Sequence, residues 1–181
     1  MRRRLSFLPL AAAALGVITS AGHAASARAA EALDADVVQA VARTLGFLES
    51  APREERFDVA VLYSPNAPNG ADAAAEVSAR LSGLPGPRRS TLRATALTPD
   101  DLDQAAEGVD AVLLTPGLAE EADWIADFIR RRRVVSISSD LDCLDSETCV
   151  VMVNAGRNVE IVLDTSLADD VGAQFSTVFT M

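Results

Sequence analysis

The chain has 181 residues, of which 26 are acidic and 16 are basic, so its net charge at neutral pH is −10. Such an acidic surface repels phosphate backbones, and the chain has no basic stripe interleaved with aromatic residues, which excludes nucleic acid as a partner. The only histidine is His23 and there is no lysine. A mature chain without residue 23 therefore lacks imidazole and Schiff-base chemistry. We predict no catalytic residues, no metal and no cofactor.

The first 30 residues have the three-part layout of a secretory signal peptide. Arginines at positions 2–4 precede an apolar run over 5–18, and small residues with A-x-A sites follow. The apolar run is shorter than the about 20 residues of a spanning helix. We predict a cleaved signal peptide over 1–29, with cleavage after Ala27 or Ala29, export to the bacterial periplasm and no membrane insertion afterwards. Cleavage removes four basic residues and no acidic residue, which leaves a net charge of −14.

After the signal peptide, apolar residues alternate between helical and strand spacing. In chain order the spacing predicts a helix over 32–48, a strand over 57–63, a loop over 64–70, a helix over 71–81, a strand over 91–97, a helix from 99 to about 106, a strand over 109–114, a helix over 119–131 and a strand over 134–138. Four strands separated by helices indicate right-handed crossovers and a mostly parallel sheet. We predict an α/β domain over 30–181, Rossmann-like or flavodoxin-like, with helices on both faces of the sheet.

The pattern changes after Ser139. Two runs with two-residue alternation, over 150–153 and 159–163, flank a turn and predict a C-terminal β-hairpin, which is antiparallel. Asp164 or Thr165 is then expected to cap a short helix that ends near Val171.

Cys143 and Cys149 are the only cysteines of the chain. In an exported protein a disulfide is the default state of such a pair, and here it would fix the entrance of the hairpin. A redox-active pair is disfavoured because five residues separate the thiols and no flanking cation would lower a thiolate pKa. A metal site is disfavoured because two thiolates without histidine leave a tetrahedral ion short of ligands.

Candidate binding residues lie in the loops that follow the predicted parallel strands. Ligands of open α/β sheets bind where these loops converge, at the carboxyl ends of the strands. The backbone N–H groups before the helix over 71–81 would hold a small anion, although ordinary turn and cap chemistry explains this segment equally well. The candidate ligand or partner residues are Ser64, Asn66, Asn69, Gly70, Thr115, Gly117, Ser139 and Asp140.

The order of features in the last 50 residues carries a family resemblance. A strand that ends in Ser139-Asp140 leads into the cysteine loop, and a hairpin, a helix and a segment from Gly172 to Ser176 follow. This arrangement resembles the YfiR family of periplasmic proteins. The resemblance implies a repressor that binds the periplasmic sensor domain of an inner-membrane diguanylate cyclase and so restrains cyclic-di-GMP synthesis and biofilm formation. It also implies that Cys143 and Cys149 match the family's stabilising disulfide.

Two other functions compete with this one. The first is a small-molecule or solute-binding protein resembling one lobe of a transport substrate-binding protein, for which the chain has residues enough for a single lobe. The second is a carboxylate-dependent hydrolase, which requires two acidic side chains to converge in a cleft. The adjacent acids at 100–101, 120–121 and 169–170 are better explained as solvated helix faces. The sequence does not decide whether the chain forms a homodimer.

Overall fold

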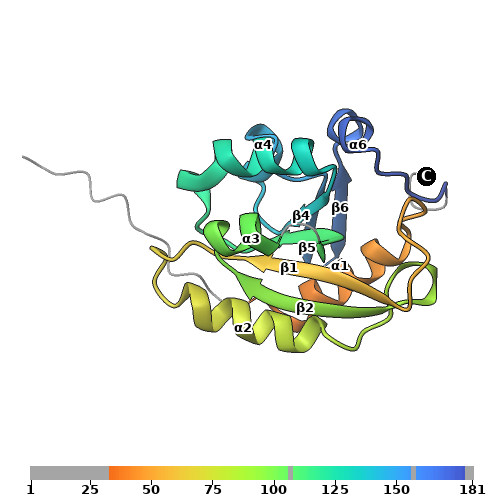
Figure 1. Ribbon diagram of the computed structural model, residues 1–181, viewed down its shortest axis with the longest axis horizontal. Coiled ribbons are helices and arrows are strands. Elements are labelled where there is room, and N and C mark those ends of the chain that lie inside the picture. Colours follow the sequence, from red (N-terminus) through yellow and green to blue (C-terminus); the bar gives the residue numbers. More distant parts are fainter. Residues whose placement is uncertain (1–32, 106–107, 156–157, 178–181) are drawn as a thin grey trace, which may run out of the picture.

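The computed structural model describes residues 33–105, 108–155 and 158–177, and within them the chain forms a six-stranded sheet flanked by helices (Figure 1). The strands are β1 (Arg56–Leu62), β2 (Thr91–Leu97), β3 (Ala111–Leu114), β4 (Val135–Ser138), β5 (Val151–Ala155) and β6 (Val159–Leu163). β1 to β5 are parallel and β6 pairs antiparallel with β5. The predicted fold class and the C-terminal hairpin are confirmed. The predicted signal peptide, residues 1–29, lies outside the described residues.

The strand order is β2-β1-β3-β4-β5-β6. Its first five strands follow the flavodoxin-like order, in which the chain moves from β1 to β2 and then returns past β1 to build the rest of the sheet. The loops after β1 and β3 therefore leave neighbouring strands toward opposite faces. The register places Leu62, Leu114 and Ser138 side by side at the carboxyl edge of the sheet. This edge is the topological switch point at which ligands bind in such folds.

Helices cover both faces of the sheet, as predicted. α1 and α2 pack together on one face, and α3, α4 and α6 lie on the other (Figure 1). The helices are α1 (Ala35–Gly46), α2 (Gly70–Leu81), α3 (Pro99–Ala105), α4 (Ala122–Arg132), the single turn α5 (Asp142–Asp145) and α6 (Thr165–Val171), with short 3-10 turns η1 (Pro87–Arg89) and η3 (Ala119–Glu121). Asp164 caps α6 by accepting the Leu167 N–H at 2.9 Å, as the sequence predicts. No helix among the described residues is both long and apolar enough to span a membrane.

Several predicted element ends are shifted by one to three residues, and three differences have a structural reason. The first helix ends at Gly46 and not at Leu48, because Leu48 forms an antiparallel bridge with Phe175, a residue close to the C-terminus of the chain. The helix expected over 119–131 is divided into the turn η3 and the helix α4. The cysteine loop contains the helical turn α5, which shows no periodic signal because a single turn is shorter than the pattern that reveals a helix.

The core is built almost entirely from aliphatic side chains on the sheet and on the facing sides of the helices. Every residue of β3 and of β4 is buried, which matches their continuous runs of apolar or small side chains and their central position in a sheet covered on both faces. Phe57 and Phe128 are the largest side chains among the fully buried residues. A well-packed sheet of this kind holds its carboxyl-edge loops in fixed positions.

Candidate functional site

A cavity of about 570 Å³ opens at the carboxyl edge of the sheet, and we refer to it as the carboxyl-edge cavity. Its lining residues are drawn from three segments, 64–67 after β1, 114–125 from the end of β3 into α4, and 138–148 after β4. This volume lies within the range of small-molecule sites, which is about 300–1,000 Å³. The cavity also lies beside the switch point between β1 and β3, where an open α/β sheet is expected to bind its ligand.

Five of the eight candidate residues from the sequence line this cavity. They are contributed by all three loops, although they are far apart in the chain, because the carboxyl ends of adjacent parallel strands meet at one edge. The five are Ser64, Asn66, Thr115, Gly117 and Asp140. The structure therefore brings the three predicted loops together at one cavity. Ligand binding by these five residues stays a prediction.

The other three candidates, Asn69, Gly70 and Ser139, are not among the lining residues. Asn69 is exposed and has a left-handed backbone (φ 60°) directly before α2. A Cβ atom on Gly70 would lie 2.9 Å from the Ser64 carbonyl oxygen, so the glycine allows α2 to start close against the loop after β1. Ser138, the residue before Ser139, lines the cavity instead, since neighbouring residues of a strand point in opposite directions.

A hydrogen bond between two loops fixes the walls on either side of the switch point. The Ser64 hydroxyl donates to Glu121 Oε1 at 2.6 Å and joins the loop after β1 to η3. The second carboxylate oxygen, Glu121 Oε2, is buried and has no hydrogen-bond partner among the described residues. The expectation that residues 120–121 form a solvated helix face is therefore wrong for Glu121. Nearby, the Thr115 hydroxyl donates to the Leu62 carbonyl at 2.9 Å, which ties the end of β3 to β1.

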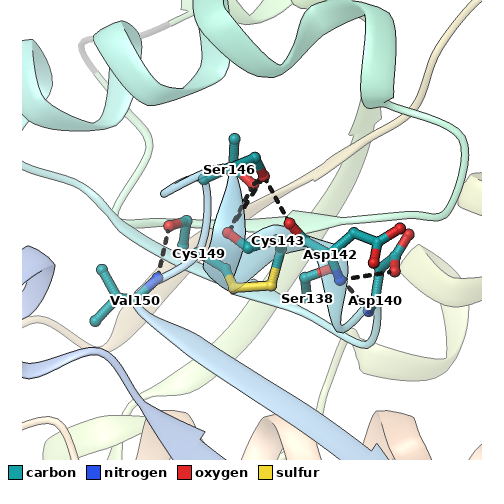
Figure 2. Close-up of a disulfide and its surroundings, with 9 residues drawn as sticks. Ser138, Asp140, Asp142, Cys143, Ser146, Cys149 and Val150 are labelled. Carbon is teal, nitrogen blue, oxygen red and sulfur yellow. Dashed lines mark hydrogen bonds between the residues drawn. A yellow bond between two sulfur atoms is a disulfide. The ribbon is translucent and has the colours of Figure 1, made fainter.

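The third wall is the cysteine loop. Cys143 and Cys149 form a disulfide, which confirms the pairing expected from the sequence (Figure 2). The Asp140 N–H donates to Ser138 Oγ at 3.1 Å, and the Asp142 N–H donates to Asp140 Oδ1 at 3.2 Å. Cys143 lines the cavity, and Cys149 directly precedes the segment that enters β5. The disulfide thus links the cavity wall to the hairpin entrance.

The charged residues that line the cavity are all acidic. Glu120 lies on the wall after β3, and Asp140 and Asp142 lie on the wall after β4. Glu120 and Asp142 were not among the candidate residues predicted from the sequence. Both residues follow the end of a central strand. This position could have predicted them, because it places a side chain at the edge of the sheet where ligands bind.

Asp110, at the opposite edge of the sheet, is the described group with a clearly shifted pKa. Burial raises the pKa of Asp110, and the nearby charges of Asp58 and Glu54 raise it further. The backbone N–H of Asp58, which donates to Asp110 Oδ2 at 2.8 Å, acts in the opposite direction on the pKa. A perturbed carboxyl group is a common mark of a functional site, but this one joins β1 to β3 and is accounted for by the sheet structure.

These features define a class: a flavodoxin-like α/β domain with an acidic cavity at the carboxyl edge of its sheet. No protein-family model and no curated protein matches the chain. The resemblance to the YfiR family therefore stays a prediction.

Solved structures do match the fold. The ABC domain in complex with L-Trp from Streptococcus pneumoniae matches with a TM-score of 0.57 at 10% sequence identity, over 81% of this chain and 59% of the other. A conserved domain protein from Vibrio cholerae O1 biovar El Tor matches with a TM-score of 0.56 at 10% identity, over 80% of this chain and 57% of the other. The matched region spans less than two thirds of the length of either structure. Similarity at this identity establishes the fold alone.

Proposed function

We propose that this chain is an exported, non-catalytic binding domain that holds a small molecule in the carboxyl-edge cavity. The cavity itself carries the proposal, because it has the volume of a small-molecule site and lies at the switch point of the sheet. Its lining combines aliphatic side chains with hydroxyl and carboxylate groups, a composition suited to holding and orienting a ligand. The matching domain from Streptococcus pneumoniae was solved with L-Trp, which supports the use of this fold for binding amino-acid-sized molecules.

Export to the periplasm is part of this proposal. The disulfide between Cys143 and Cys149 supports it, because disulfides persist in oxidising compartments and are rare in the cytosol. The layout of residues 1–29 supports it from the sequence. The chain would then act as a single lobe that meets its ligand outside the cytoplasm.

A small-molecule panel tests the binding function. We expect at least one class among amines, amino acids, sugars, carboxylates and nucleosides to raise the melting temperature, because a ligand that binds only the native state stabilises it. Ala119 is exposed and lines the cavity, so Ala119→Trp should fill the cavity and abolish the increase. Ala79→Trp, the same change at an exposed position of α2 outside the lining, should preserve the increase. A panel in which no class raises the melting temperature would contradict the proposal.

For the physiological role, we propose that the chain restrains a membrane-bound diguanylate cyclase by contact with its sensor domain. The sequence resemblance to the YfiR family supports this role. An exposed apolar strand supports a protein contact: Val159 and Ile161 of β6 are 53% and 37% exposed, and among the described residues β6 pairs with β5 alone. Such a strand offers backbone and apolar groups to a partner.

The level of cyclic-di-GMP in the native bacterium tests this role. Deleting the gene is expected to raise the level, and restoring the wild-type gene is expected to lower it again. A Val159→Ser/Ile161→Ser variant should fold, since both side chains are exposed, and should fail to restore the low level. If the level is unchanged by deletion while the gene is expressed, the regulatory role is wrong and small-molecule binding is untouched. If the variant restores repression fully, the contact does not use β6.

A further inference from the structure

We infer that the ligand of the carboxyl-edge cavity is an aliphatic diamine or polyamine. This inference rests on the proposed binding function and adds the chemical class of the ligand. The first observation is the sign of the charge: the lining includes Glu120, Asp140 and Asp142, and no described lining residue is Arg or Lys. An anionic ligand would meet uncompensated repulsion here, whereas a cation would gain charge-assisted hydrogen bonds.

The three carboxylates lack cationic partners from the protein. Within residues 33–105, 108–155 and 158–177, the ion pairs involve other acids, such as Glu76 with Arg80 and Glu147 with Arg130. Glu120, Asp140 and Asp142 form none of these pairs, so in the described part of the chain a ligand ammonium group has no protein cation to displace from them. The Asp140 carboxylate accepts the Asp142 N–H through Oδ1, which fixes its orientation and leaves Oδ2 to accept from a ligand.

A buried carboxylate oxygen strengthens the preference for a cation. Glu121 lies between the lining residues Glu120 and Ala122, and its Oε1 atom accepts from the lining hydroxyl of Ser64. Its Oε2 atom is buried without a partner among the described residues, a state that is unfavourable for a carboxylate. A ligand ammonium group bound beside this wall would offset the negative charge of Glu121.

The positions of the acids indicate more than one ammonium group. Glu120 lies on the wall after β3, whereas Asp140 and Asp142 lie on the wall after β4, so the negative charge has two centres. The lining also holds aliphatic side chains, Leu114 and Ile125 among them, beside its hydroxyl groups. A methylene chain with a primary ammonium at each end would place one cation at each acidic wall and its apolar middle against the aliphatic lining. No aromatic side chain occurs among the described lining residues, which disfavours a quaternary ammonium, whose usual partner is an aromatic cage.

Calorimetric titration of the full mature chain tests the inference. Putrescine and spermidine are the probes, butanediol is the uncharged control and succinate is the anionic control. We expect the two amines to bind, with an affinity that decreases as salt is added. Asp140→Asn/Asp142→Asn keeps the shape of the wall and one acceptor oxygen on each side chain while removing two charges. It should weaken amine binding by about tenfold or more, because the hydrogen bonds from the ammonium groups would lose the charge of their acceptors.

A matched variant separates a local effect from the effect of net charge. Glu54→Gln/Glu55→Gln removes two exposed charges just before β1, at the opposite edge of the sheet, and should leave amine affinity unchanged. Equal weakening by both double variants would overturn the inference, because it would indicate diffuse attraction to an acidic surface. Binding of succinate or butanediol in place of the amines would overturn the inference and leave the binding function standing. If no class in the panel binds, the binding function and the inference both fail.

Discussion

Replacing Phe128 with alanine is expected to lower the free energy of unfolding by about 3–5 kcal/mol, the usual cost of removing a buried phenyl ring and leaving a cavity. Phe128 is 1% exposed and stacks on Trp124 with ring centroids 5.1 Å apart. The ring anchors α4, whose first turn supplies the wall of the carboxyl-edge cavity next to the switch point. Urea denaturation followed by the circular dichroism of the helices measures the change.

Phe128→Leu is the graded control for this prediction. It retains an apolar side chain in the same position, and its cost should be clearly smaller than that of Phe128→Ala because less of the contact surface is lost. Equal midpoints for the wild type and Phe128→Ala would show that α4 is not held by this ring. A large loss for Phe128→Leu as well would indicate that the shape of the ring, and not its buried area, is decisive.

Reduction of the Cys143–Cys149 disulfide is expected to cost about 2–2.5 kcal/mol, because a short closed loop restricts the unfolded chain only modestly. The melting temperature should therefore be lower with dithiothreitol than without it. Both sulfur atoms belong to buried residues, so the measurement requires reduction to be complete before heating. The expected loss is smaller than for Phe128→Ala because the hydrogen bonds of the loop remain.

The chain offers a direct control for the reductant. It contains no other cysteine, so a Cys143→Ser/Cys149→Ser variant should melt at one temperature whether or not dithiothreitol is present. Its melting temperature should also be close to that of the reduced wild type. Identical melting of the wild type with and without reductant would mean that the disulfide has no stabilising role in the native protein.

The order of helices and parallel strands could be predicted because local periodicity reports it. The strand over 91–97 is the clearest case, since β2 occupies the same residues. Periodicity does not reveal contacts between distant residues. The division of the 119–131 helix accompanies the bond between Ser64 and Glu121, two residues separated by 57 positions. The turn α5 is likewise held by a disulfide and by side-chain bonds within a polar loop.

The site was predictable to the extent that topology decides it. Parallel strands bring the loops after β1, β3 and β4 to one edge, and residues such as Thr115 and Asp140 were found by that rule. Glu120 was missed because adjacent acidic residues usually face solvent on a helix, and Asp142 was missed because it was considered only as part of the cysteine loop. Ser139 was chosen in place of Ser138 because the sequence does not fix which of two consecutive residues at a strand end turns toward the cavity.

The carboxyl-edge cavity is assembled from segments between residues 64 and 148, so it exists only when most of the sheet has formed. Occupancy is consequently linked to unfolding of the whole domain and not to the opening of one loop. At a ligand concentration of about 100 times Kd, this linkage contributes about 2.7 kcal/mol, which is similar to the expected contribution of the disulfide. A saturated, reduced protein should therefore resist unfolding about as well as an empty, oxidised one.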